Sequence, residues 1–263
     1  MTENNIIEKI NLLGVPLTVF DSYEHAVETI IGRIKEENKT TCIAINPIKI
    51  YLAQKDKELL TSLTGSDFQI CDGVGASLAA KFLYHKKVHR ITGIQLFFEL
   101  ISRAEQIGHK VFLLGAKPES NEGAYNKLVK MHPNLQIVGR HDGYSNNHDN
   151  VIQKINNSHA DMLFVAKGSP YQEKWINKYC SQINVTFCMG VGGTFDILSK
   201  NAKWAPKIFR KTGTEFLYRL IKEPHRLKRQ YVLLFYIFLV LKSKFTAGNN
   251  QVQDAGYKYE HLK

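Results

Sequence analysis

The sequence has few cysteines and no long apolar run. Its four cysteines, at positions 42, 71, 180 and 188, are far apart and include no CxxC pair, which predicts reduced thiols in the core. The longest apolar run, 231–241, has 11 residues, whereas a helix needs about 20 to cross a bilayer. This run can lie in a membrane surface but cannot cross the membrane. The N-terminus lacks the basic region and apolar stretch of an export signal, so we expect the chain in the cytosol.

Motifs for a metal ion or a dinucleotide are also missing. No DxD, no HExxH and no pair of Cys or His at metal-ligand spacing occurs, so we expect no metal and no other cofactor. Gly190, Gly192 and Gly193 follow a predicted strand, but their spacing is not the GxGxxG of dinucleotide-binding proteins. Asp196 lies only three positions after the last of them, instead of about 20 positions later. An oxidoreductase of the Rossmann type is therefore disfavoured.

Basic residues are concentrated towards one end of the chain. Residues 203–244 contain eleven Lys or Arg and only two acids, which gives this segment +9 of the chain's formal net charge of +11. Such a concentration favours one large anionic partner: a membrane surface, a lipid diphosphate or nucleic acid.

The middle of the chain alternates short apolar runs with helical patterns, which is typical of βα units in a mostly parallel sheet. We therefore predict a Rossmann-like α/β core over residues 1–207, with helices on both faces of the sheet. A basic amphipathic appendage, 208–245, is expected to hold helices over 214–222 and 224–241, and a polar tail, 246–263, to follow it. The six predicted strands are residues 42–45, 68–71, 111–114, 136–138, 162–166 and 185–189.

Polar and small residues follow five of these strands, and open parallel sheets bind their ligands at such carboxyl ends. Asp72 can take a proton from an acceptor hydroxyl, or it can belong to an ordinary Asp-Gly turn. Asn46 can orient a sugar hydroxyl, or it can start the turn before Pro47. Gln172 can reach the same crevice from the first turn of a helix, or it can be a plain helix-start residue.

The glycines after the last strand also have two interpretations. At Gly190, Gly192 and Gly193 the backbone can approach a phosphate closely, as in a nucleotide diphosphate site, or it can form a plain tight turn. Asp196 can accept hydrogen bonds from a ribose or a base, or it can cap a helix.

Three arginines are the most suggestive charges of the basic segment. Arg226 and Arg229 share one face of a predicted helix, and Arg219 lies on the preceding one. Planar guanidinium groups match phosphate oxygens two at a time, so the three can clamp a diphosphate. They can also form a solvated basic face. The apolar residues interleaved with them favour a helix that faces anionic lipid.

Several motifs in the same order resemble the WecG/TagA/CpsF family of bacterial glycosyltransferases. The resemblance runs from about residue 41 to residue 230. The motif sequences are more similar to the branch that transfers N-acetylmannosaminuronic acid in enterobacterial common antigen assembly, because Ala44 stands where teichoic-acid members carry Thr. The motifs are Ala44-Ile-Asn46, CDGVG, FLLGAKPE, GRHDGY, GSPYQE, MGVGGTFD, Ala205-Pro206 and GTEFLYRLIKEPHRLKRQ.

This resemblance implies an inverting, metal-independent transferase that is attached to the cytoplasmic face of the membrane. It implies a UDP-sugar donor and an undecaprenyl-diphosphate-linked saccharide acceptor, with no nucleic acid as partner. The resemblance implies that Asp72 is the general base and that the side-chain amides of Asn46 and Gln172 contact sugar. The arginines for the lipid diphosphate are Arg219, Arg226 and Arg229, and the nucleotide is expected along Gly115, Gly168, Gly190, Gly192, Gly193 and Asp196.

Other interpretations remain open at the level of sequence. A family member can transfer glucose, galactose or mannose in capsule or exopolysaccharide assembly instead of an N-acetylmannosamine-type sugar. A peripheral membrane-binding module would use the same basic helices without chemistry. The apolar face of the appendage must be covered in solution, and a homo-oligomer is one way to cover it.

Overall fold

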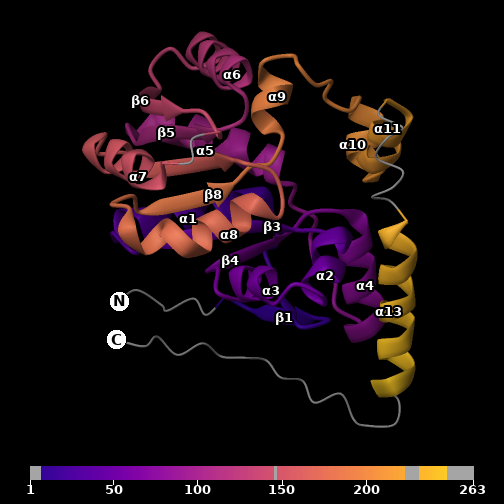
Figure 1. Ribbon diagram of the computed structural model, residues 1–263. Helices are drawn as coiled ribbons and strands as arrows, with labels where there is room; N and C mark the ends of the chain where they lie inside the picture. The colour runs from indigo at the N-terminus through magenta and orange to yellow at the C-terminus, as the bar shows by residue number, and fades with distance from the viewer. Residues whose placement is uncertain (1–6, 145–146, 223–230, 248–263) are drawn as a thin grey trace.

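A computed structural model describes residues 7–144, 147–222 and 231–247 of the chain. Its centre is a sheet of six parallel strands in the order β4-β3-β8-β7-β5-β6 (Figure 1). All six predicted strands are confirmed, and β4 and β7 have the predicted bounds. The strands are β3 (Thr40–Ile45), β4 (Phe68–Cys71), β5 (Lys110–Gly115), β6 (Gln136–His141), β7 (Met162–Ala166) and β8 (Phe187–Gly190).

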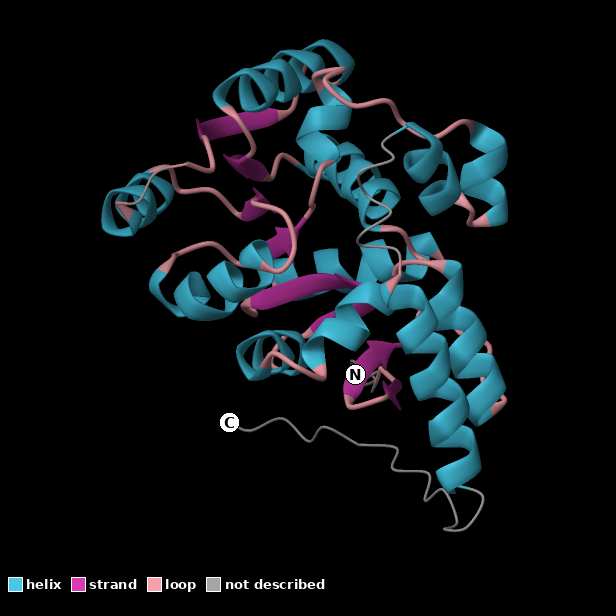
Figure 2. Cartoon of the chain, turned by 45° about the vertical axis from the view of Figure 1, so that its right-hand side comes forward, coloured by secondary structure: helices cyan, strands magenta, loops and turns pink. Residues whose placement is uncertain are grey.

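Helices cover both faces of the sheet, as predicted (Figures 1 and 2). Alternate strand residues point to opposite faces, so that Cys42 and Ala44 belong to one core and Ile43 and Ile45 to another. The first face carries α1 (Tyr23–Lys35), α5 (Gly93–Ile107), α6 (Pro118–Met131) and α9 (Thr194–Leu198). The second carries α2 (Pro47–Ala53), α3 (Lys57–Thr64), α4 (Val74–Tyr84), α7 (His148–Asn157) and α8 (Tyr171–Tyr179), which η1 (Cys180–Gln182) follows.

An antiparallel hairpin near the N-terminus was not predicted. It consists of β1 (Lys9–Leu12) and β2 (Val15–Thr18). Its two-residue turn, Leu13 and Gly14, has φ values of 55° and 84°, as the tight turns that suit the twist of a hairpin require. The hairpin buries its apolar side chains in the core of the second face, beside α2, α3 and α4.

The four cysteines are buried and free in the structure, which confirms the prediction of core thiols. The helix α1 begins directly after Ser22. Ser22 caps the helix, because its side chain accepts the hydrogen bond of the His25 backbone N–H.

The basic segment begins with two short helices, α10 (Lys207–Thr212) and α11 (Glu215–Lys222). After residues 223–230, which lie outside the described parts, α13 (Val232–Ala247) runs along the second face. It packs there through Val232, Tyr236 and Val240, and the Tyr236 hydroxyl donates to the Gly75 carbonyl over 3.3 Å. The predicted helix 224–241 is thus described only from residue 232 on, and most of the predicted polar tail lies outside the described residues.

The other side of α13 leaves large apolar side chains uncovered. Among the described residues, no helix has the length and the hydropathy that a membrane crossing needs. The exposed side chains on and beside this helix are Tyr231, Leu234, Phe235, Ile237, Phe238, Leu241 and Phe245.

Candidate active site at the carboxyl edge of the sheet

Asp72 and Asn46 lie side by side at the ends of neighbouring strands. Asp72 follows β4, and its backbone N–H donates to the Ile45 carbonyl of β3 over 2.7 Å. A Cβ added to Gly73, the next residue, would lie 3.8 Å from the Asn46 Cβ. The Asn46 side-chain oxygen caps α2 by accepting from the Lys49 backbone N–H over 3.0 Å. The structure therefore brings the predicted base and the first predicted amide to one corner of the sheet.

The carboxylate of Asp72 faces the start of α5. Its Oδ2 lies 3.8 Å from the point that a Cβ of Gly93 would occupy. The Ala44 Cβ and the Met189 Cε are 3.3 and 3.9 Å from the same point. Because these groups come from the ends of β4, β3 and β8, the carboxylate stands where three strands and a helix N-terminus converge. A helix N-terminus favours a negative charge beside it.

Gln172 connects the glycine loop after β8 to α8. Its side-chain oxygen accepts from the Gly192 backbone N–H over 2.9 Å, and its amide nitrogen donates to Glu173 Oε1 over 2.8 Å. Only 2% of its surface is exposed, and a Cβ added to Gly190 would strike this side chain at 2.7 Å. Both polar ends of the amide thus have protein partners, and a direct contact of Gln172 with sugar stays a prediction.

The loops after β5 and β7 are in close contact. A Cβ on Gly115 would lie 2.6 Å from the Ala166 carbonyl carbon, so that only glycine allows these strands to approach in this way. The Gly168 carbonyl accepts from the Gln172 N–H over 2.8 Å at the start of α8. The predicted glycines therefore line adjacent strand ends, and their role toward a nucleotide stays a prediction.

Asp196 lies in the first turn of α9 rather than at the cap, which is Gly193. Its Oδ1 accepts from the Ser120 hydroxyl of α6 over 2.7 Å, and Asn201 donates to the same hydroxyl over 2.9 Å. The helix-cap interpretation is therefore wrong for this residue. Its Oδ2 lies 3.8 Å from the point that a Cβ of Gly193 would occupy, and its contact with a ribose or a base stays a prediction.

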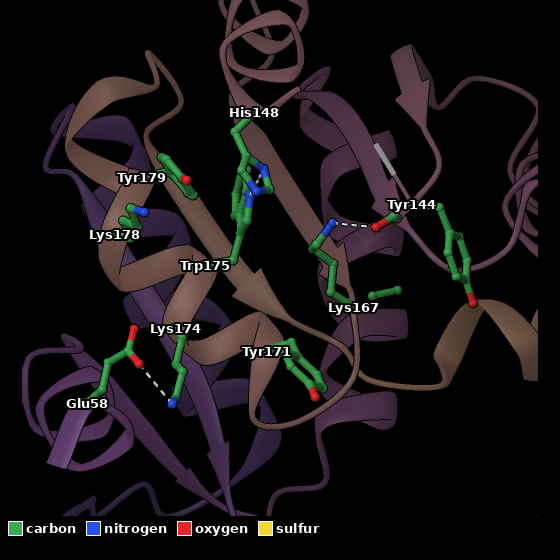
Figure 3. Close-up of a pocket in the computed structure, with 12 residues that line it drawn as sticks. Glu58, Tyr144, His148, Lys167, Tyr171, Lys174, Trp175, Lys178 and Tyr179 are labelled. Atoms are coloured by element: carbon green, nitrogen blue, oxygen red, sulfur yellow. Dashed lines mark hydrogen bonds and ion pairs between the residues drawn. The ribbon is translucent and has the colours of Figure 1, made fainter. Parts of the chain in front are cut away.

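A cavity of about 500 Å³ opens between α7 and α8 at the ends of β5 and β7 (Figure 3). Lys167 points into it and donates to the Gly143 carbonyl over 2.6 Å. Burial lowers the pKa of Lys167, while the charge of Asp142 opposes this shift. Lys174 is held by Asp56 and Glu58 at 2.8 and 2.9 Å. The charged residues that line the cavity are Lys167, Lys174, Lys178 and Glu58, and its aromatic walls are Tyr144, Tyr171, Trp175 and Tyr179.

Two residues at this edge escaped the sequence reasoning. Arg90 pairs with Glu215 of α11 at 3.4 Å and donates to the Arg210 carbonyl of α10. It therefore ties the first helices of the basic segment to the end of β4, where Gly213 also packs against Val74. Lys49, in α2, forms a buried ion pair with Glu173. Neither belongs to a motif that spacing alone would single out.

The three predicted arginines are only partly covered by the structure. Arg219 belongs to α11, and its side chain lies outside the described residues, as do Arg226 and Arg229 altogether. Their contact with a lipid diphosphate stays a prediction. Within the described ranges, no group of three or more His, Cys, Asp or Glu could hold a metal ion.

Residues 10–250 match the protein family described as "Glycosyl transferase WecG/TagA/CpsF family". The chain belongs to this family. A relative from Bacillus subtilis (strain 168), named N-acetylglucosaminyldiphosphoundecaprenol N-acetyl-beta-D-mannosaminyltransferase, is 32% identical over 244 residues. The alignment covers 92% of this chain and 93% of the relative. The family resemblance that the sequence motifs indicated is therefore confirmed, and the protein is a glycosyltransferase. The distinction between the two branches stays a prediction.

Proposed function

We propose that this glycosyltransferase moves an N-acetylmannosamine-type sugar from a UDP donor to an undecaprenyl-diphosphate-linked GlcNAc acceptor. The sugar is N-acetylmannosaminuronic acid or N-acetylmannosamine. The observation that carries the proposal is the similarity to the B. subtilis relative over nearly the full length of both chains. That relative's name specifies the mannosaminyl group and the GlcNAc-diphosphoundecaprenol acceptor, which favours this substrate class over glucose, galactose or mannose.

In this proposal, Asp72 is the general base. It accepts the proton of the acceptor hydroxyl while the hydroxyl oxygen attacks the anomeric carbon from the face opposite to UDP. The new glycosidic bond forms as the bond between the anomeric carbon and the diphosphate oxygen breaks, so the configuration inverts. The position of Asp72 supports this role, because its carboxylate faces the junction of β3, β4 and β8 where substrates of open parallel sheets bind.

Negative charge develops on the departing diphosphate. Backbone N–H groups of the glycine loops and the guanidinium groups of Arg219, Arg226 and Arg229 are suited to stabilise it, since removal of one such donor typically costs about 3 kcal/mol. The attachment of α10 and α11 to Arg90 supports this arrangement, because it holds the start of the basic segment at the end of β4. We propose that no metal ion takes part.

The decisive experiment measures UDP release with a short-chain GlcNAc diphosphate lipid as acceptor. The donors are UDP-N-acetylmannosamine, UDP-N-acetylmannosaminuronic acid, UDP-glucose and UDP-galactose, with and without EDTA. We expect turnover with one of the first two donors and no loss in EDTA. Turnover only with glucose or galactose would contradict the proposed sugar class.

The Asp72→Asn variant tests the base. It should lower kcat by about 10²- to 10⁴-fold, the contribution usual for general base catalysis, while the dissociation constant for UDP changes little. Asp21→Asn is the matched control, because the Asp21 side chain is 88% exposed and pairs with His25 at 3.4 Å. An Asp72→Asn enzyme with normal kcat would exclude Asp72 as the base.

We also propose that the enzyme binds the cytoplasmic face of the anionic inner membrane through α13. The exposed apolar side chains of this helix and the neighbouring Lys242 and Lys244 support an interfacial position. In vesicle flotation, the Leu234→Ser/Phe238→Ser variant should lose binding to anionic vesicles. Val129→Ser/Met131→Ser, which changes exposed apolar residues of α6, is the control and should float as the unchanged protein does. Equal flotation of the α13 variant, or a stable homo-oligomer that covers this face, would contradict the proposal.

A further inference from the structure

A buried ion pair links two corners of the site. Lys49 Nζ lies 2.7 Å from Glu173 Oε1, and the two side chains are 6% and 0% exposed. The same ammonium donates to the Ala44 carbonyl of β3 over 2.6 Å. The pair therefore joins β3 and α2 to α8.

The ion pair also determines which way the Gln172 amide points. An ionised carboxylate accepts hydrogen bonds and donates none. Glu173 Oε1 can therefore receive only the NH₂ end of Gln172, as it does over 2.8 Å. The carbonyl end of the amide then faces the Gly192 backbone N–H and accepts from it over 2.9 Å. One charged pair thus orients an amide, and the amide fixes the loop after β8.

The same lysine also supports the opposite corner. Its backbone N–H donates to the Asn46 side-chain oxygen over 3.0 Å, beside Asp72. Lys49 thus contacts Asn46 through its backbone and, by way of Glu173 and Gln172, reaches Gly192.

The second oxygen of Glu173 argues against a purely stabilising role. Glu173 Oε2 is buried and has no hydrogen-bond partner among the described residues. Buried ion pairs stabilise a fold only when the geometry satisfies their remaining hydrogen-bonding groups, and apolar side chains of similar volume often do as well. A carboxylate that leaves one oxygen unpaired is a poor choice for stability alone.

We propose that Lys49 and Glu173 are positioning residues for the donor site. They keep the Gln172 amide in the one orientation that holds the Gly190–Gly193 loop in the shape that receives the UDP diphosphate. The assignment of UDP to this loop rests on the proposed function. Without the pair, the amide can turn, its NH₂ would face the Gly192 N–H, and two donors would oppose each other.

The test replaces both charges by apolar groups of similar size, Lys49→Met/Glu173→Leu, so that no unpaired charge remains in the core. We expect a folded protein with a circular dichroism spectrum like that of the unchanged enzyme. UDP affinity should fall about tenfold, the order expected for one lost hydrogen bond, and the donor KM should rise with it. The acceptor KM should stay within about twofold. The control is Lys86→Met/Glu8→Leu, which removes an exposed pair away from the strand ends and should leave UDP affinity unchanged.

A second comparison separates positioning from a general structural role. The variant Gln172→Leu should lose UDP affinity by itself. Adding Lys49→Met/Glu173→Leu to it should cause no further loss, because all three residues act through the same contact to Gly192. Additive losses would overturn the proposal.

Hydrogen exchange in the ligand-free protein tests the positioning without any substrate. The peptide that contains Gly192 should exchange faster in Lys49→Met/Glu173→Leu than in the unchanged protein, and unchanged exchange would overturn the inference. An unchanged enzyme that fails to bind UDP would instead refute the proposed function. Normal UDP affinity in the double variant would refute the positioning role alone.

Discussion

Replacing Gly115 by alanine should destabilise the protein more than replacing any exposed turn glycine. Gly115 has φ of 114°, a conformation that residues with a Cβ rarely adopt. The added methyl group would lie 2.6 Å from the Ala166 carbonyl carbon and oxygen and 2.8 Å from its nitrogen. Carbon atoms in contact normally stay about 3.5–4.0 Å apart. Since the obstacle is the backbone of the adjacent strand, no side-chain rotation can relieve the clash.

The expected cost is the sum of two effects. The unfavourable φ costs about 1–2 kcal/mol, and overpacking against a strand costs about 1–3 kcal/mol. The free energy of unfolding should therefore fall by about 2–5 kcal/mol. Near the midpoint, a loss of about 3 kcal/mol lowers the melting temperature by roughly 6–12 °C for a chain of this size.

The assay is urea unfolding followed by circular dichroism, with Gly14→Ala as the matched control. Gly14 also has a positive φ, 84°, but a Cβ there would meet nothing within 4 Å. Its replacement should therefore cost only the backbone strain, about 1–2 kcal/mol. Equal losses in the two variants would show that the strand ends are not packed as closely as the structure indicates.

Two further predictions concern other parts of the molecule. Arg90→Ala should lower kcat/KM for the acceptor roughly tenfold, a loss of about 1.4 kcal/mol, because it frees α10 and α11 from the core. UDP affinity, measured by calorimetry, should stay the same. Unchanged acceptor kinetics would contradict this prediction. Burial raises the pKa of the Cys42 thiol to about 12. The unfolded thiol ionises from about pH 8.5 upward, so the contribution of Cys42 to the free energy of unfolding is complete below that pH. It is lost as the pH rises toward 12, by about 2 kcal/mol at pH 10. The urea midpoint should therefore fall between about pH 8.5 and pH 10, and it should fall less in Cys42→Ala.

The sheet was predictable because its strands leave a clear pattern. Five of the six strands of the central sheet are buried along most of their length and read as short apolar runs between turn residues, as 68–71 and 162–166 do. The edge strand β6 alternates exposed and half-buried residues. The β1–β2 hairpin was missed because neither strand is a continuous apolar run and one includes Pro16, which is unusual inside a strand. Burial against α2, α3 and α4 decides its structure, and that contact is not visible in the local sequence.

The site was predictable only to the level of strand ends. Chain order and the rule for parallel sheets are enough to place Asp72 and Asn46 at one edge of the sheet. The partners of Gln172 and Asp196 could not be predicted, because Gly192 and Ser120 are distant in sequence and come close only in the folded chain. For the same reason, Lys49 looked like an ordinary helix residue. No residue near Lys49 in the sequence indicates that its side chain pairs with Glu173.

The first ten residues of α13, 232–241, are all apolar, so that this part of the helix has apolar side chains on every face, whereas an amphipathic helix has a polar one. The side chains of Val232, Tyr236 and Val240 pack in the core, while those of Leu234 and Phe238 are exposed. Because these outer side chains are already exposed, the lipid binding proposed above would need no partial unfolding, and its free energy would add to that of folding. If α13 binds lipid as proposed, anionic vesicles should raise the melting temperature of this enzyme by mass action.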